Sequence, residues 1–422
     1  MRKNVWIWNH YATNMFFDEG GRHYWFAHYM KNAGYEPTIF CASTIHNSEQ
    51  FVDTYGQEFR RDETNEIPFV FVKTPSYKGN GKSRILNMVS FYKNLFPIAK
   101  KYAKEHGKPD VILASSVHPL TLVAGIKIAK KFGVPCICEV RDLWPESLVA
   151  YGSLKPNSLF ARLLYRGEKW IYKKADAIVF TVEGGKDYIK ERKWDVDNGG
   201  SINLDKVYHI NNGVDLDTFE ANVSRNVLYD DDLADQNTFK VIYTGSIRGV
   251  NNIRVLVEAA KYIKEQSVEK VRFIIYGDGD QKNELVNWCE TNGIDNVCFK
   301  GRVDKRYVPY VLSKSDINIL HFKQSTIKKY GTSMNKLFDY FASGKPTVSD
   351  CEVGYDLINR YNAGVSADII DPHKLADVIL FFLNMNERDY FQYCSNAKRA
   401  SQDYDYKTLT DKLLAILQII EE

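Results

Sequence analysis

The sequence predicts an α/β protein built from two Rossmann-like domains that face a central cleft. Short apolar runs alternate with helix-period segments along most of the chain, which is the pattern of parallel βαβ units. A polar, acidic stretch follows Asp215 and continues to Asn237 in this chain of 422 residues, and such a stretch is typical of a domain boundary. We therefore expect an N-terminal domain over 1–213, a C-terminal domain over 214–400, and a terminal helix over 401–422 that packs back towards the N-terminal domain.

The composition is that of an ordinary globular protein, with 44% apolar and 26% charged residues. No apolar run approaches the roughly 18 residues that a membrane-spanning helix needs, and the apolar part of the N-terminus is too short for a signal peptide. Seven scattered cysteines show no metal-ligand spacing, so we expect reduced thiols and a cytoplasmic protein. No metal is expected, and the run Asp230-Asp231-Asp232 is interpreted as exposed charge.

The charge of the chain is unevenly placed. Residues 1–213 carry 30 Lys and Arg against 22 Asp and Glu, whereas the remainder carries 26 against 31, which suggests that the first half faces something anionic. Residues 69–108 hold nine basic residues, one acid (Glu105) and apolar residues such as Ile85 and Phe96 at helical spacing. Two interpretations remain open for this segment: a core-facing helix with a solvated lysine face, or peripheral contact with an anionic membrane at the inner face of the plasma membrane. Nucleic acid is not an expected partner, because no known binding motif is present.

The first domain opens as a βαβ unit. We expect a strand over 5–8, a loop that contains Gly20-Gly21, a helix over 22–32 and a second strand over 38–41. A dinucleotide fingerprint would need Gly-x-Gly-x-x-Gly, so a nicotinamide site is not predicted. The glycine pair either makes a tight turn or lets the backbone approach a sugar or phosphate closely.

Polar residues follow two later strands of this domain. His118 comes just after a buried strand over 111–114, where it could reach a ligand or could be merely structural. The next strand, over 136–140, carries Glu139 and is followed by Arg141 and Asp142. The carboxyl ends of parallel strands line the crevice where open sheets bind ligands, so we favour a functional role for these charges over a structural ion pair. Strands over 176–180 and 206–210 complete the predicted sheet.

The second domain repeats the alternation. Strands over 240–244, 271–276 and 297–303 run into Gly245-Ser246, Gly277 and Arg302-Val303 respectively. A further strand over 317–320 precedes the stretch over 330–346, in which a polar loop (Tyr330, Gly331, Thr332, Ser333, Asn335) enters an apolar helical segment that ends at Gly344 and Pro346. Ser333 is the expected N-cap. Free N–H groups at such a helix start favour an anion, with Lys336 and Asp339 close by.

Together these segments resemble the retaining glycosyltransferases of family four, which have the GT-B architecture. The resemblance covers nearly the whole chain and is carried by short motifs in a specific order: Gly20-Gly21, Asn212-Gly213-Val214-Asp215, Tyr243-Thr244-Gly245-Ser246, Tyr276-Gly277-Asp278-Gly279, Phe299-Lys300-Gly301, Asn335-Lys336-Leu337-Phe338-Asp339-Tyr340 and Gly344-Lys345-Pro346. The block Arg141-Asp142-Leu143-Trp144-Pro145 looks like the subgroup that builds bacterial surface polysaccharides, often by transfer of acetamido-sugars.

The resemblance implies roles for individual residues. Two glutamates eight positions apart bracket the donor in the family, and the matching positions here are Asp339, which would bind the ribose, and Gly331, which has no side chain. Arg248 matches the family arginine after the first strand of the second domain, and Lys336 is expected to supply the missing lysine. The implied catalytic residues are Arg248, Lys336, Arg141 and Asp142. The implied donor-binding residues are Gly20, Gly21, His118, Gly245, Ser246, Gly277, Arg302, Val303, Tyr330, Ser333, Asn335 and Asp339.

The resemblance implies transfer of a sugar from a nucleotide-sugar, with UDP the commonest nucleotide, to a glycan or polyprenyl-linked acceptor. It implies retention of configuration and no metal or other cofactor. Two alternatives stay open: a sugar-nucleotide epimerase of the same fold, for which His118 is the obvious first-domain histidine, and a non-catalytic assembly partner, suggested by Gly331.

Overall fold

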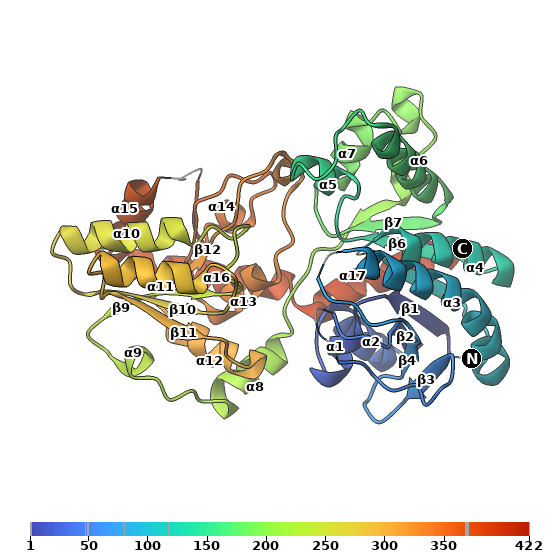
Figure 1. Cartoon of the computed structure of the whole chain (residues 1–422), viewed down its shortest axis with the longest axis horizontal. Helices are drawn as coiled ribbons and strands as arrows, with labels where there is room; N and C mark the ends of the chain where they lie inside the picture. The colour runs from blue at the N-terminus through green and yellow to red at the C-terminus, as the bar shows by residue number, and fades with distance from the viewer. Residues whose placement is uncertain are drawn as a thin grey trace. The chain divides into compact units, whose positions relative to one another are not determined.

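The chain folds into two α/β units, which a computed structural model describes over residues 2–46, 48, 50–79, 81–116, 118–367 and 371–421 (Figure 1). Unit 1 comprises Met1–Asn211 and Tyr406–Glu422, and unit 2 comprises Asn212–Asp405. The chain therefore changes unit twice, and residues 401–405 belong to unit 2 rather than to the terminal helix.

Unit 1 is organised around an eight-stranded sheet within the described residues, of order β3-β4-β2-β1-β5-β6-β7-β8. All neighbouring strands are parallel except β3, which runs antiparallel to β4. The strands are β1 (Asn4–Asn9), β2 (Glu36–Ala42), β3 (Phe59–Asp62), β4 (Phe69–Val72), β5 (Val111–Ser115), β6 (Cys136–Val140), β7 (Ala177–Phe180) and β8 (Val207–His209). The order reverses between β1 and β5, which is where open sheets bind ligands.

Helices cover both faces of this sheet. They are α1 (Thr13–Phe17), α2 (Arg22–Asn32), α3 (Lys82–His106), α4 (Pro119–Phe132), α5 (Glu146–Ala150), α6 (Leu159–Lys174), α7 (Gly185–Glu191) and α17 (Tyr406–Glu421), with 3-10 turns η1 (Val196–Asn198) and η2 (Leu204–Lys206). Helix α17 packs against α2, and α4 contacts both α3 and α6. The core is built on the apolar β1, in which Trp6 and Trp8 are fully buried. The Trp6 ring lies 5.0 Å from that of Phe40 and 5.4 Å from that of Tyr102.

Unit 2 repeats the doubly wound plan with a parallel sheet of order β11-β10-β9-β12-β13-β14. Its strands are β9 (Phe239–Thr244), β10 (Val271–Tyr276), β11 (Val297–Gly301), β12 (Ile317–Leu320), β13 (Thr347–Ser349) and β14 (Gly364–Ser366). Its helices are α8 (Leu216–Arg225), α9 (Asp231–Ala234), α10 (Arg254–Glu265), α11 (Lys282–Thr291), α12 (Val308–Ser313), α13 (Asn335–Ser343), α14 (Leu357–Tyr361), α15 (Pro372–Leu383) and α16 (Glu387–Asp403), with 3-10 turns η3 (Lys305–Tyr307) and η4 (Thr326–Tyr330). The order reverses between β9 and β12.

The predicted α/β class with two Rossmann-like halves is confirmed, and so are the predicted strands of both sheets and the helix Arg22–Asn32. Helix α6 was not predicted. The basic segment 69–108 contains β4 and the whole of α3, whose side chains Phe91, Leu95 and Ile98 are buried as a core-facing helix requires. Ile85, in the first turn of α3, was expected on that face and is instead 59% exposed. No helix within the described residues is long and apolar enough to cross a membrane.

Two charged groups expected at the surface or in a site are structural. Asp230 was interpreted as exposed charge, but its carboxylate accepts from Lys300 Nζ at 2.7 Å and from the Tyr276 hydroxyl at 2.5 Å. Glu139 is fully buried, and its carboxylate accepts from Arg22 Nε at 2.7 Å and Ser115 Oγ at 2.7 Å. Neither pairing can be predicted from the local sequence, because the partner residues are distant along the chain.

The Glu139 carboxylate links β6 to helix α2. His23 Nε2 lies 2.9 Å from its second oxygen, and Arg22 also donates to the carbonyl of Ile210 just past β8. Burial alone would raise the pKa of the Glu139 carboxyl, but Arg22 and His23 hold it well below its usual range. The interaction is therefore a buried, hydrogen-bonded ion pair.

Replacement of this carboxylate should destabilise unit 1. Glu139→Ala removes the charge that faces Arg22 and His23, and we expect the free energy of unfolding to fall by about 3–5 kcal/mol, measured by urea denaturation. Asp142→Ala, two residues past the same strand and exposed, should change it by less than about 0.5 kcal/mol. Equal losses in the two variants would contradict the structural role of Glu139.

Candidate active site

Glycines at the carboxyl ends of β9, β10 and β11 bring three loops into contact. Gly245 N donates to the Tyr276 carbonyl at 2.9 Å, and Gly277 N donates to the Gly301 carbonyl at 2.8 Å. A Cβ added at Gly277 would lie 1.7 Å from the Gly245 carbonyl oxygen. The φ angles of Gly245 and Gly277 are +152° and +155°, so this close approach requires glycine at both positions.

Lys336 extends from α13 to the Gly245 turn. Its Nζ lies 3.1 Å from the Tyr243 hydroxyl and 4.4 Å from the centre of that ring, and a Cβ on Gly245 would come within 2.5 Å of it. Burial lowers the pKa of Lys336 to about 8. No carboxylate pairs with Lys336 among the residues that the structure describes, so this partly buried cation lacks a protein counter-charge. Tyr243, which contacts it, belongs to one of the sequence motifs but was not predicted as a site residue.

Helix α13 begins without a side-chain cap. Its N-cap is Met334, and its first turn contains no acidic residue. The prediction that Ser333 caps this helix is wrong: the Ser333 hydroxyl accepts from Asn212 N at 2.9 Å, and its carbonyl accepts from Asn212 Nδ2 at 2.7 Å. Asn212, 121 residues away in the sequence, thus binds Ser333 in place of the predicted capping interaction. The start of α13 therefore has no side-chain cap, which is favourable for an anion there.

Asp339 shares the partly open side of α13 with Lys336, three residues earlier. Burial raises the pKa of Asp339 to about 6, against the opposing effect of Lys305. The buried side chains of this helix, Leu337, Phe338 and Phe341, lie on its other side. Lys336 and Asp339 are thus presented together, away from the core.

Only some of the other predicted donor-binding residues of unit 2 lie at the carboxyl end of β9. The Ser246 carbonyl accepts from the Tyr243 hydroxyl at 2.9 Å, and Ser246 Oγ accepts from Asn251 Nδ2 at 2.6 Å, so this residue shapes the turn. Arg248 and Arg302 are exposed, and Val303 is partly buried just past β11. The structure gathers Gly245, Ser246, Gly277 and Lys336 at the β9 end. It gives no contact between this group and either arginine.

The loop before α13 has a backbone that excludes the family's usual glutamate. Tyr330 is buried at the end of η4, and Asn335 is exposed at the start of α13. Gly331 between them has φ +96°, a conformation that a residue with a side chain rarely adopts. The missing carboxylate therefore reflects the path of the chain and not only the residue type.

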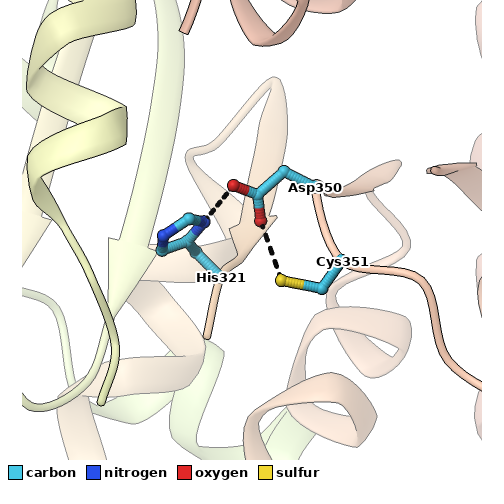
Figure 2. Close-up of side chains that lie close together, drawn as sticks. All are labelled: His321, Asp350 and Cys351. Carbon is cyan, nitrogen blue, oxygen red and sulfur yellow. Dashed lines mark hydrogen bonds and ion pairs between the residues drawn. The ribbon is translucent and has the colours of Figure 1, made fainter. Parts of the chain in front are cut away.

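A buried His–Asp–Cys cluster lies where the chain leaves β12 and β13 (Figure 2). His321, Asp350 and Cys351 follow β12 and β13, are each at most 2% exposed, and offer ligand atoms within 4.8 Å of one another. Figure 2 shows His321 and Asp350 pointing at each other, in direct contact through Nδ1 and Oδ2. The ligand atoms of a tetrahedral ion lie about 3.3 Å apart, so the pair leaves no room for an ion between those two atoms.

The thiol of this cluster has a partner of its own. Cys351 Sγ donates to the Phe322 carbonyl at 2.7 Å, and burial raises the pKa of Cys351 to about 12, which favours the protonated thiol. The cluster is thus a set of contacts that joins the loops after β12 and β13. The Gly354 N–H donates to the Lys328 carbonyl at 3.0 Å and extends the same junction.

In unit 1 a histidine pair occupies the point where the strand order reverses. His118 follows β5, and its Nε2 lies 2.6 Å from Nδ1 of His10, which follows β1. Both rings are buried. Burial, with Arg84 adding to it, lowers the pKa of His118 to about 3, so the ring is neutral. Its Nδ1 is buried without a hydrogen-bond partner among the described residues. His10 was missed in the sequence because nothing local distinguishes it.

The remaining predicted residues of unit 1 lie at loop positions. Gly21 has φ +100° and precedes the first turn of α2, and Gly20 is adjacent to it. Arg141 N donates to Ser116 Oγ at 3.0 Å, whereas its Nε is buried without a partner among the described residues. Asp142 is exposed. Arg141 therefore retains a buried donor for a ligand.

The sequence matches two known families, one in each half. Residues 24–218 match the model described as Glycosyltransferase Family 4, and residues 228–400 match that described as Glycosyl transferases group 1. The chain belongs to the group 1, family 4 glycosyltransferases, which confirms the resemblance carried by the motifs.

Two named bacterial glycosyltransferases are similar to parts of this chain. A stretch of 214 residues is 26% identical to TuaH of Bacillus subtilis (strain 168), provisionally named as a glycosyltransferase of teichuronic acid biosynthesis, and covers 50% of this chain and 49% of TuaH. A stretch of 293 residues is 24% identical to WbjE of Pseudomonas aeruginosa, also provisionally named as a glycosyltransferase, and covers 67% of this chain and 68% of WbjE. The match thus spans about half the length of TuaH.

Solved structures share the fold over the whole chain. Sucrose-phosphate synthase from Thermosynechococcus elongatus has a TM-score of 0.71 at 15% identity, and the match covers 99% of both chains. HepE of Anabaena in complex with UDP and glucose has a TM-score of 0.64 at 15% identity, over 99% of this chain and 100% of HepE. At these identities the likeness shows the fold, two parallel-sheet Rossmann-like domains of the GT-B type.

A side chain at position 331 should cost stability. Gly331→Glu restores the family residue but places it at φ +96°, and we expect a loss of about 1–3 kcal/mol in the free energy of unfolding and no gain in transfer rate. Gly249→Ala, in the neighbouring loop where an added Cβ meets only Gln281 at 3.7 Å, is the matched control. A more active Gly331→Glu variant would show that the position tolerates the carboxylate.

Proposed function

We propose that this chain is a retaining hexosyltransferase that moves a sugar from a nucleotide-sugar, with UDP the expected nucleotide, to a glycan or polyprenyl-linked acceptor in cell-surface polysaccharide synthesis. The observation that carries the proposal is the Lys336 ammonium. It is partly buried, has no carboxylate partner among the described residues, and lies at the uncapped start of α13 against the Gly245 turn. Such a site is suited to a diphosphate.

In this proposal the diphosphate contacts Lys336, Arg248 and the backbone N–H groups around Ser333 to Asn335. Departure of the nucleotide leaves new negative charge on the phosphate, and donors fixed in advance stabilise it by roughly 3 kcal/mol each. Asp339 accepts hydrogen bonds from the ribose hydroxyls. The base lies near Arg302 and Val303, and Gly245, Ser246, Gly277 and Tyr330 shape the site.

Residues of unit 1 serve the acceptor and the transferred sugar. Nε of Arg141 and Nδ1 of His118 are buried without a partner among the described residues and are a donor and a possible acceptor suited to sugar hydroxyls. Asp142 directly follows Arg141, and we assign the Gly20-Gly21 turn to the same role. A polyprenyl-linked acceptor would place the enzyme at the inner face of the plasma membrane. The exposed start of α3, within the basic segment 69–108, is suited to an anionic surface there.

Catalysis in this scheme needs neither a metal nor a pair of acid and base carboxylates. The departing phosphate helps to deprotonate the acceptor hydroxyl as the anomeric bond breaks, and configuration is retained. The relatives TuaH and WbjE, both provisionally named as glycosyltransferases, support a place in surface-polysaccharide synthesis.

The two alternatives make different demands on the site. An epimerase would use His118 as a base, but burial lowers the pKa of that ring to about 3, which makes it a poor one. A non-catalytic assembly partner would need no nucleotide. Calorimetry with UDP separates this case, since a transferase binds the nucleotide without its acceptor.

Loss of the lysine charge should weaken both binding and turnover. Lys336→Ala and Arg248→Ala should each reduce turnover by at least about tenfold, which corresponds to about 1.4 kcal/mol. An anion raises the pKa of Lys336 above its free value of about 8, so UDP affinity should fall as pH rises through 8 in the wild type and stay flat in Lys336→Met. Lys314→Ala, which changes an exposed lysine directly after α12, is the control. Normal turnover in both active-site variants would refute the phosphate assignment.

The ribose assignment predicts a change in discrimination. The wild type should bind UDP about tenfold more tightly than its 2′,3′-dideoxy analogue, because Asp339 is left without partners by the analogue. Asp339→Ala should bind both ligands equally, as measured by calorimetry at pH 7.5. Equal discrimination by wild type and variant would place the ribose elsewhere.

A further inference from the structure

Helix α6 of unit 1 exposes three bulky apolar side chains at its start. Leu159 is 84% exposed, Phe160 59% and Leu163 63%. Leu163 lies four residues after Leu159 and three after Phe160, so it neighbours both on the helix surface, and the three form a single apolar surface. Exposed apolar residues are ordinary when scattered, but a cluster of large ones indicates a binding surface.

The opposite side of α6 anchors it to unit 1. Ala161, Ile171 and Tyr172 are buried, and the Tyr172 ring lies 5.5 Å from that of Phe180 at the end of β7. The Ser158 side chain caps the helix by accepting from Ala161 N. The exposed apolar turn is therefore held rigidly and does not result from a frayed end.

Basic residues surround this apolar surface. Residues 147–175 contain six Lys and Arg and one acid, Glu168. Lys155, Arg162, Arg166, Lys173 and Lys174 are exposed, and none of the ion pairs found among the described residues involves them. Glu168 is buried, accepts from the hydroxyls of Tyr172 and Tyr188 at 2.7 Å each, and faces away from the surface. The exposed side of α6 thus carries positive charge that nothing on the helix offsets.

The start of α3 presents a second exposed apolar turn at the same end of unit 1. Ile85 is 59% exposed and Leu86 58%, and Lys82 precedes them. Helices α3 and α6 each lead into a strand parallel to the one before, so both begin at the carboxyl end of the sheet, and both contact α4. The two exposed apolar turns, each with basic neighbours, therefore both lie at the carboxyl end of the unit 1 sheet.

We propose that Leu159, Phe160 and Leu163, with Arg162 and Arg166, form a surface by which unit 1 docks onto an anionic phospholipid bilayer. We call these five residues the α6 patch. The apolar side chains enter the boundary between headgroups and acyl chains while the guanidinium groups contact lipid phosphates. A bilayer fits better than nucleic acid, because aliphatic side chains occupy the centre of the patch where base stacking or phosphate contacts would need aromatic or charged ones.

This docking surface rests on the proposed function, because its role would be to hold the enzyme at the membrane where a polyprenyl-linked acceptor lies. The α6 patch contains none of the residues assigned to the donor or to catalysis. Membrane binding and nucleotide binding can therefore be measured separately and can fail separately.

The test is co-sedimentation of the full chain with vesicles of phosphatidylcholine alone and of phosphatidylcholine mixed equally with phosphatidylglycerol. We expect binding to the mixed vesicles at least about tenfold tighter than to neutral ones, weakening as salt is raised because exposed charges are screened. Leu159→Ser/Phe160→Ser/Leu163→Ser and, separately, Arg162→Glu/Arg166→Glu should each reduce binding at least about tenfold.

The matched control changes the same residue types on unit 2. Arg388→Glu/Phe391→Ser alters an exposed arginine and a phenylalanine that is 61% exposed on α16, and it should bind vesicles like the wild type. Unchanged melting temperature and UDP affinity in the α6 variants would show that they fold.

Equal vesicle binding by wild type and α6 variants, or tighter wild-type binding to a DNA oligonucleotide than to mixed vesicles, overturns the proposal. UDP binding without vesicle binding overturns the docking surface alone, whereas vesicle binding without UDP binding overturns the proposed function alone.

Discussion

The close approach of Gly245 to Gly277 is the constraint on which the candidate site depends. With a Cβ position 1.7 Å from a carbonyl oxygen, the loops after β9 and β10 can meet only through bare backbone. Their contact leaves the β9 turn open on one side, and Lys336 fills that opening from α13. The lysine is then partly buried beside Tyr243, and no carboxylate pairs with it in the part of the chain that the structure describes. This arrangement is unfavourable in the free protein and would become favourable with an anion bound. In the proposed function, the loops of the sheet thus create the anion site.

Structural and ligand-directed charges in this chain are distinguished by their partners. Glu139 is fully buried, yet Arg22, His23 and Ser115 satisfy its oxygens, so its carboxylate stays ionised and closed to other ligands. For Lys336 and Asp339 the pKa values move the other way: burial lowers that of the lysine to about 8 and raises that of the aspartate to about 6. Each is pushed towards its neutral form because the protein supplies too little compensation. In the proposed function, nucleotide phosphates and ribose hydroxyls would supply what is missing.

Periodicity was sufficient to predict most of the fold, because strand and helix patterns are local. It failed where a distant residue decides the outcome. Ser333 looks like an N-cap, but Asn212 engages its hydroxyl and carbonyl, and α13 begins at Asn335. Glu139 looks like part of a site, but α2 covers it. Helix α6 was not predicted, although its residues follow an amphipathic pattern. Position 331 illustrates the opposite case, since the missing glutamate was visible in the sequence while its cause was not.

That cause extends beyond one residue. Gly331 takes a left-handed φ directly after η4. The η4 turn is joined to its surroundings by the hydrogen bond from Gly354 N to the Lys328 carbonyl and by Lys328 Nζ, which lies 4.6 Å from the centre of the Phe322 ring. The Phe322 carbonyl in turn accepts from the Cys351 thiol. A carboxylate at 331 would need a different backbone there, and such a change would act on these contacts. In the proposed donor site, recognition of the sugar is then left to the neutral groups and the backbone of the 330–335 loop, so donor specificity would depend on the contacts that hold η4.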